Sequence, residues 1–209
     1  MSGVENVSGG GVFSPTERIT MPAYVREIID RLNSRGFSAY AVGGAVRDCA
    51  LGLFPDDWDV ASSALPEEIE STFSDFRVIE TGIKHGTVSV VTGGNTVEIT
   101  TFRKESGYSD NRHPDAVEFV GDIAEDLRRR DFTVNSLAYN EKDGLIDLYG
   151  GLSDIQNKIV RAVGNPEERF SEDSLRILRA VRFSSKLGFS IEKQTLAAAE
   201  KLKSRLKNV

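Results

Sequence analysis

The sequence has one cysteine among 209 residues and no long run of apolar side chains. The lone Cys49 excludes a disulfide within the chain and favours a reducing compartment, so we expect a cytoplasmic protein. No segment approaches the roughly 18 to 20 apolar residues that a membrane-spanning helix needs. The N-terminus also lacks the basic and then apolar order of a secretory signal. These absences exclude a disulfide scaffold and indicate a protein that works without a membrane.

Positive charge is scarce overall, with 26 Lys and Arg against 32 Asp and Glu and a net charge of −6. The shortage is uneven, because residues 161–209 carry eleven basic against six acidic side chains, a net +5. Such a basic segment can face phosphate groups, and a charge-rich helical surface has the same composition. Composition alone leaves both interpretations open.

Local patterns predict helices at both ends of the chain and strands between them. Residues 1–21 are rich in Gly, Ser and Val without a period, and we expect a mobile leader. Residues 103–116 are polar and predict a long flexible loop. Apolar spacing and turn residues predict helices over 22–35, 45–52, 63–73, 171–187 (with Ser171 as cap) and 190–206 (with Ser190 as cap), and strands over 37–42, 57–60, 76–80, 87–91, 96–102 and 145–149. Gly36 and Gly188 are natural helix stops, residues 92–95 predict a hairpin turn, and Gly150 with Gly151 predicts a hinge.

Three acidic residues follow the alternation expected of strands. Asp57 and Asp59 alternate with Trp58 and Val60, which sends both carboxylates to one face. Glu98 lies between Val97 and Ile99 in the same manner. Mg²⁺ prefers one or two carboxylates together with substrate phosphates, so the acids predict a nucleotide-handling metal site. The alternative for an isolated Asp-x-Asp is an exposed strand end with scattered acids.

A pair of glycines precedes these acids. Gly43 and Gly44 stand between an apolar strand and a short helix, where backbone amides can approach a phosphate, and Arg47 follows one turn later. Gly-Gly, a spacer of twelve residues, Asp-hydrophobic-Asp-hydrophobic and then hydrophobic-acid-hydrophobic resemble the DNA polymerase beta-type nucleotidyltransferase superfamily.

A stripe of charged residues recurs every three positions near the C-terminal end. Asp173, Arg176, Arg179 and Arg182 would share one helix face, and an ion pair between Asp173 and Arg176 would be an ordinary surface feature. Alternatively, cytosine and adenine each present an amino donor beside an unprotonated ring nitrogen, which one Asp and one Arg complement. Uracil and guanine present the reverse pattern, so such a pair would select C and A without a template.

Five motifs follow one another along the chain, at residues 43–48, 57–59, 129–135, Asp147 with Gly151 and Asp154, and 172–179. In this order they are similar to the motifs of the class II tRNA nucleotidyltransferases (CCA-adding enzymes) and the bacterial poly(A) polymerases. The resemblance implies an α+β head domain, with a small mixed sheet flanked by helices, followed by an all-helical neck. It implies that Asp57 and Asp59 bind Mg²⁺ with Glu98 as third carboxylate, and that Gly44 and Arg47 hold a triphosphate.

The resemblance also assigns the remaining site. Arg130 and Asp131 would address phosphate and ribose, Asp173 and Arg176 would read the base, and Arg179 and Arg182 would contribute to the nucleotide site. Substrates would be CTP, ATP and the 3′ end of tRNA or another RNA. We expect a head over 22–150 and a neck over 151–209, with body and tail domains absent.

Several functions remain open within this resemblance. CCA addition, CC-only addition, A-only addition and poly(A) synthesis use the same chemistry, and residues 82–87 and 108–114 favour CCA addition only weakly. A non-catalytic RNA-binding module is a further alternative, whose signature would be loss of a carboxylate.

Overall fold

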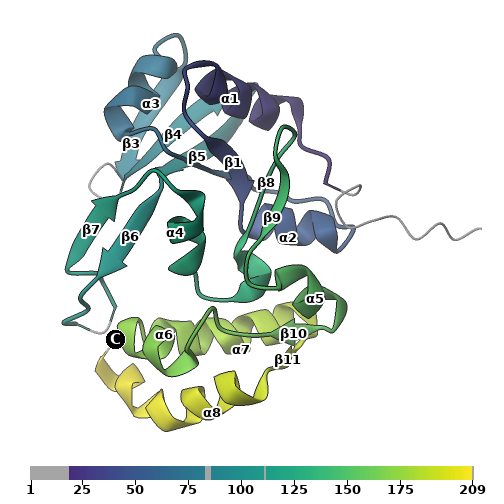
Figure 1. The fold of residues 1–209 in the computed structure, drawn as a ribbon, viewed down its shortest axis with the longest axis vertical. Coiled ribbons are helices and arrows are strands. Elements are labelled where there is room, and N and C mark those ends of the chain that lie inside the picture. The colour runs from purple at the N-terminus through teal and green to yellow at the C-terminus, as the bar shows by residue number, and fades with distance from the viewer. Residues whose placement is uncertain (1–18, 83–85, 111, 209) are drawn as a thin grey trace, which may run out of the picture.

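The computed structural model describes residues 19–82, 86–110 and 112–208, and it confirms the α+β class (Figure 1). A sheet with flanking helices forms the upper part of the view, and a group of helices lies beneath it. The helices are α1 (Ala23–Ser34), α2 (Gly44–Ala50), α3 (Pro66–Thr72), α4 (Ile123–Arg128), α5 (Gly151–Gln156), α6 (Pro166–Glu172), α7 (Leu175–Leu187) and α8 (Lys193–Leu202), with 3-10 turns η3 (Thr133–Asn135) and η4 (Lys203–Asn208).

The described strands form one large sheet and two small ribbons. The large sheet has the order β3-β4-β5-β2-β1-β8-β9, and only β2 and β5 pair in parallel within it. The strands are β1 (Ala39–Val42), β2 (Asp59–Ser62), β3 (Arg77–Gly82), β4 (Thr87–Thr92), β5 (Asn95–Thr101), β6 (Arg103–Ser106), β7 (Ala116–Phe119), β8 (Leu137–Asn140), β9 (Gly144–Asp147), β10 (Ile159–Val160) and β11 (Ser190–Ile191).

The central strand β1 is buried on both faces, which explains its unbroken apolar run. Ala39 and Ala41 belong to the main core, whereas Tyr40 and Val42 belong to a smaller core on the other face. Helix α1 covers the main core with Val25, Ile28, Ile29 and Leu32, and Gly36 stops it at a φ of 90° as predicted. No helix among the described residues combines the length and apolarity required to cross a membrane.

The expected mobile leader falls mostly outside the described residues. Its last three residues are described, and Ile19 and Met21 are buried in the main core. The packed part of the chain therefore includes these residues ahead of the predicted boundary at residue 22.

The predicted hairpin between β4 and β5 is confirmed. Gly93 and Gly94 form the two-residue turn, with φ of 57° and 79°. Positive φ at both central positions is the requirement of the hairpin turn that matches strand twist, and glycine meets it without strain.

The prediction of a structureless loop over residues 103–116 was wrong at both ends. Strands β6 and β7 form a two-stranded antiparallel ribbon there. The half-buried positions of β6 are Arg103 and Glu105, which are charged rather than apolar. Alternation of hydrophobicity was therefore absent, and the sequence pattern concealed the strand.

The prediction of one helix starting at a Ser171 cap was also wrong. Helix α6 runs through Ser171 to Glu172, Asp173 is extended with φ −134° and ψ 106°, and α7 starts at Leu175. Gly188 ends α7 as predicted, with φ 66°. Ser190 lies in β11, and Glu192 rather than Ser190 caps α8 by accepting from the backbone N–H of Thr195.

Hydrogen bonds join the predicted hinge at Gly150 and Gly151, and the helix α5 that follows it, to β9 and to η3. Asp147 accepts from the backbone N–H groups of Gly151 and Leu152 at 2.8 and 2.9 Å. Asp154 accepts from the Thr133 hydroxyl at 2.7 Å and pairs with Arg161 at 3.0 Å. These bonds fix the start of α5 against η3.

Candidate active site

The three predicted acids lie on inner strands of the sheet, at the edge formed by the strand ends, where β1 ends and β2 begins beside β5. Val42 pairs with Asp59 across antiparallel strands, and Asp59 pairs with Glu98 across parallel strands. Trp58 and Val60 are buried, whereas Asp57, Asp59 and Glu98 are exposed, so the predicted alternation is confirmed. The parallel register sends Asp59 and Glu98 to the same side because directly paired residues share a face.

Negative charge accumulates around Asp59. Displacement of water by the surrounding protein raises the pKa of Asp59, and the charges of Glu98 and Asp57 add to this rise while Arg130 opposes it. Asp57 also lies near the start of α1, since burial and then the charge of Asp57 raise the pKa of Tyr24. Within the described ranges, no three His, Cys, Asp or Glu side chains form a ready-made metal cluster.

Gly43 makes the turn from β1 into α2 with φ 71° and ψ −127°. The positive φ favours glycine here, and a Cβ atom at this position would lie 3.1 Å from Nη1, the far end of the Arg130 side chain. Arg130 of this chain therefore lies against the glycine turn.

Arg47 is buried and firmly held. Its Nε donates to Asp48 at 2.8 Å and its Nη1 donates to Oδ1 of Asn135 at 2.5 Å. Its guanidinium also lies 5.5 Å from the ring centroid of Phe183, and that of Arg179 lies 5.4 Å from the same ring. Phe183 thus joins α2 to α7, and sequence analysis did not single it out.

Asp131 connects the motif at 129–135 to α7. Its Oδ1 accepts from the backbone N–H of Phe132 at 2.8 Å and from Asn135 at 3.3 Å. Its Oδ2 accepts from Nε of Arg179 at 2.7 Å. The predicted nucleotide residues Asp131 and Arg179 are therefore partners of each other.

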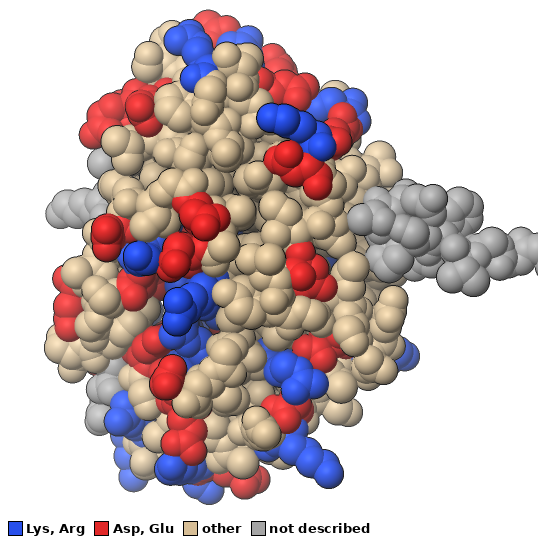
Figure 2. Space-filling view, in the orientation of Figure 1, with Lys and Arg blue, Asp and Glu red and all other residues tan. Residues whose placement is uncertain are grey.

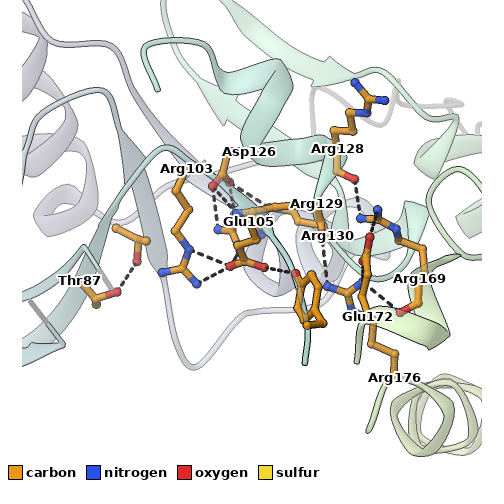
Figure 3. A network of polar contacts seen from close by, with 12 residues as sticks. Thr87, Arg103, Glu105, Asp126, Arg128, Arg129, Arg130, Arg169, Glu172 and Arg176 are labelled. Atoms are coloured by element: carbon orange, nitrogen blue, oxygen red, sulfur yellow. Dashed lines mark hydrogen bonds and ion pairs between the residues drawn. The ribbon is translucent and has the colours of Figure 1, made fainter. Parts of the chain in front are cut away.

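A polar network joins the ribbon β6–β7 to the same motif (Figure 3). Glu105 accepts from Arg103 and from Nη1 of Arg129, both at 2.9 Å, and from the hydroxyl of Tyr108 at 3.0 Å. Burial alone would raise the pKa of Glu105, but Arg129 and Arg103 lower it below its ordinary value. No local sequence pattern indicates this network, because its members are dispersed along polar segments of the chain.

Because the chain is extended at Asp173, between α6 and α7, Asp173 and Arg176 do not have the spacing of two residues on one regular helix. The ion pair considered between them does not form among the described residues; Arg176 instead donates to Glu172 at 2.7 Å and to the carbonyl oxygens of Arg169 and Arg129, both at 3.2 Å. Oδ1 of Asp173 accepts from the backbone N–H of Leu175 at 2.9 Å. Oδ2 of Asp173 and Nε of Arg176 have no partner within the described part of the chain.

These elements enclose a cleft of about 530 Å³. Figure 2, in the orientation of Figure 1, shows Lys and Arg side chains beside Asp and Glu side chains across the middle of the molecule. Of the predicted site residues, Asp57, Glu98 and Arg182 do not line the cleft, and Arg182 is exposed on α7. The lining residues are Gly43, Gly44, Arg47, Asp59, Arg129, Arg130, Asp131, Asn135, Asp173, Leu175, Arg176, Arg179 and Phe183.

Comparison with known proteins identifies the family. The profile of the Poly A polymerase head domain matches residues 39–161. The chain is 55% identical to the CCA-adding enzyme of Ligilactobacillus salivarius (strain UCC118) over 174 residues, which make up 83% of this chain and 43% of that protein. The structure of the Bacillus stearothermophilus CCA-adding enzyme in complex with CTP matches with a TM-score of 0.76 at 40% identity, over 90% of this chain and 49% of that one.

A more distant structure has the same arrangement. The Thermotoga maritima CCA-adding enzyme complexed with tRNA-CCA matches with a TM-score of 0.75 at 26% identity, over 93% of this chain and 46% of that one. The chain thus spans about half the length of the relatives it matches. Because the head-domain profile covers more than half of its residues, the chain belongs to the Poly A polymerase head domain family.

Proposed function

We propose that the chain carries the catalytic and base-selecting part of a tRNA nucleotidyltransferase that adds C and A from CTP and ATP to the 3′ end of tRNA. The observation that carries the proposal is the cleft, which brings Asp59, the Gly43 turn, Arg130 and the Asp173–Arg176 pair together. The relatives described above are CCA-adding enzymes, one of them crystallised with CTP. We further propose that residues 22–150 form the head and 151–209 the neck, and that the protein works in the cytoplasm.

The proposed reaction is attack of an RNA 3′-hydroxyl on the α-phosphate of the nucleotide, with pyrophosphate as leaving group. The chain supplies position and charge rather than a nucleophile. Gly44 and Arg47 would lie against the phosphates, Arg130 would donate to them, and Asp131 with Arg179 would bound the ribose. Arg182 is exposed on α7 and, like Asp57 and Glu98, lies outside the cleft lining; its contribution to the nucleotide site stays a prediction.

The acidic edge fits a divalent cation, and we propose Mg²⁺. Asp59 and Glu98 are adjacent, and burial and then the charge of Glu98 raise the pKa of Asp59 while Arg130 opposes this rise. Two carboxylates with substrate phosphates form the donor set that Mg²⁺ prefers, with Asp57 as a further oxygen donor beside them. Bound Mg²⁺ would supply charge neutralisation at the phosphates and would lower the pKa of the attacking hydroxyl.

Selection of C and A would fall to Asp173 and Arg176. Oδ2 of Asp173 can accept from an exocyclic amine, and Nε of Arg176 can donate to the neighbouring ring nitrogen. Contacts with Glu172 and two backbone carbonyls hold the Arg176 guanidinium in place, so the pair is preorganised for these bases. Uracil and guanine would leave donors facing donors, which a site of fixed polar groups rejects strongly.

The decisive experiment combines nucleotide incorporation with sequencing of product ends. The chain is incubated with Mg²⁺, labelled CTP or ATP, and tRNA lacking CCA, lacking only the final A, or complete. We expect addition to the two incomplete substrates and none to complete tRNA. Long A tails would instead identify a poly(A) polymerase, additions that stop at CC or are confined to A would identify partial enzymes, and nucleotide binding without any incorporation would favour a non-catalytic module.

A further inference from the structure

Asp126 is a buried carboxylate shared by two arginines of the cleft. It lies in α4, and its side chain is 1% exposed. Oδ1 accepts from Nη2 and Nε of Arg129 at 2.7 and 3.0 Å, whereas Oδ2 accepts from Nη2 and Nε of Arg130 at 3.0 and 3.3 Å. Each carboxylate oxygen therefore serves one guanidinium, and both arginines line the cleft (Figure 3).

The two arginines differ in what remains available to a ligand. The third nitrogen of Arg129, Nη1, donates to Glu105 at 2.9 Å, so all three guanidinium nitrogens already have a hydrogen-bond partner. Arg130 places only Nε and Nη2 on Asp126, and Nη1 has no partner among the described residues. This Nη1 is the atom that lies 3.1 Å from the Cβ position of Gly43. The bonds to Asp126 thus leave one donor of Arg130 directed at the glycine turn.

We propose that Asp126 is a positioning residue that directs Nη1 of Arg130 toward the Gly43 turn, where the phosphates of the incoming nucleotide would bind. The location of the phosphates rests on the proposed function; the orientation of Arg130 does not. Two hydrogen bonds from Nε and Nη2 to the single acceptor Oδ2 orient the guanidinium more closely than one bond would, and the opposite charges strengthen both. Burial disfavours the charged carboxyl, but Arg130 and Arg129 lower the pKa of Asp126 below its ordinary value, so the carboxylate persists at neutral pH.

Binding of CTP and of cytidine to the whole chain separates this role from a structural one. Asp126→Asn keeps the shape of the side chain and removes its charge. We expect it to weaken CTP binding by about 10- to 100-fold, the loss usually seen when an outer partner of a ligand is removed, and to leave cytidine binding unchanged. Asp122→Asn, which alters the exposed cap of the same helix, is the matched control and should change CTP binding less than about twofold.

A double-mutant cycle tests whether Asp126 acts through Arg130. Arg130→Ala should weaken CTP binding at least as much as Asp126→Asn, and the double variant should bind like Arg130→Ala alone. Losses that multiply, or unchanged CTP binding in folded Asp126→Asn, would overturn the proposal. If Asp126→Asn fails to fold, Asp126→Glu replaces it, because that variant keeps the charge and shifts the carboxylate by one methylene.

A second measurement needs no nucleotide. The ¹H–¹⁵N resonance of Nε in Arg130, assigned by its absence in Arg130→Ala, should lie apart from those of exposed arginines and move toward them in Asp126→Asn or Asp126→Glu. An unchanged resonance overturns the positioning role whatever the chain binds. Failure of the unaltered chain to bind CTP would instead count against the proposed function and leave the resonance to decide the role of Asp126.

Discussion

Asp131 accepts a hydrogen bond of 2.7 Å from Nε of Arg179, although 48 residues separate them. The bond joins the motif that follows α4 to the middle of α7. Asp131 also holds Phe132 and Asn135, and Asn135 in turn holds Arg47. One buried carboxylate therefore ties the sheet, the glycine turn and the helical part into a single wall of the cleft.

Removal of this carboxylate should destabilise the fold markedly. Asp131→Ala leaves three donors without their acceptor, and we expect a loss of about 3 kcal/mol in the free energy of unfolding. Lys201→Ala is the matched control, because its 2.6 Å pair with Glu167 is exposed and should contribute less than about 1 kcal/mol. Urea denaturation followed by circular dichroism measures both; equal losses would contradict this account.

The start of α5 should tolerate no side chain. A Cβ at Gly151 would lie 2.4 Å from the carbonyl oxygen of Thr133, a backbone atom that cannot move aside. We expect Gly151→Ala to lower the free energy of unfolding by about 2 to 3 kcal/mol. Gly121→Ala, where no atom lies within 4 Å, should stay within about 0.5 kcal/mol of the unaltered chain. A thermal shift for Gly151→Ala as small as that of the control would refute the prediction.

Substitution of Asp57 or Asp59 should slow nucleotide incorporation far more than substitution of their neighbour Asp56. Asp57→Ala and Asp59→Asn should each reduce the rate of nucleotide incorporation by at least about 10²-fold, since each removes charge stabilisation at the reacting phosphate. Asp56→Ala changes the exposed acid next to Asp57 and should retain near-full activity. Single-turnover incorporation with tRNA lacking its final A provides the comparison, and a wild-type rate in Asp57→Ala would exclude the proposed metal role.

Asp173→Ala should relax base selection more than it slows the reaction. Loss of the acceptor for an exocyclic amine should bring incorporation of U and G closer to that of C and A by about tenfold or more. Lys186→Ala, an exposed change on α7, should leave the ratio unaltered. The measurement is kcat/KM for each of the four nucleotides. If Asp173→Ala left the ratio of C and A to U and G unchanged, residues 173–176 would be a structural helix junction without a role in base selection.

The ribbon network should make stability sensitive to acid. Because the folded-state pKa of Glu105 is lowered from 4.5, its contribution is fully present above that value and is lost as pH falls through the lower, folded pKa. Glu105→Gln should therefore be less stable than the unaltered chain at pH 7, by about 1 to 3 kcal/mol, and the difference should shrink below pH 4.5. Glu118→Gln, on an exposed position of the same ribbon, is the control. Denaturation between pH 3 and 7 in which the difference stayed constant would contradict the assignment.

The sequence predicted elements whose signals are local. Alternation around Asp57 to Val60, the glycine pair at 93 and 94 and the stop at Gly188 all depend on neighbours within a few positions, and all three were confirmed. The ribbon β6–β7 was missed because its half-buried residues are charged: Arg103 pairs with Glu105, and Glu105 also pairs with Arg129, 24 positions away, in a segment with no apolar period. The break at Asp173 was missed because the charge pattern continues through it.

The cleft itself was predicted only in part, for a similar reason. Gly44, Arg130 and Asp173 carry motifs that can be read singly, and they line the cleft. Phe183 takes its importance from Arg47, a partner distant in sequence. Asp126 lies only four positions from Arg130, but a run of charged residues does not reveal that its carboxylate is buried and orients that guanidinium. The three-residue period also placed Arg182 in this set; its side chain is exposed on α7, outside the cleft lining, and its role stays a prediction.

The parallel pairing of Asp59 with Glu98 has a consequence for how this chain can vary. The ladder between β2 and β5 sets the two acids side by side, whatever the length of the connection between them. Insertions or deletions at the Gly93–Gly94 tip would leave that register intact, whereas a slip of a single residue along β5 would turn Glu98 into the core. Length variation among homologous chains should therefore collect at the tip and be absent from the ladder.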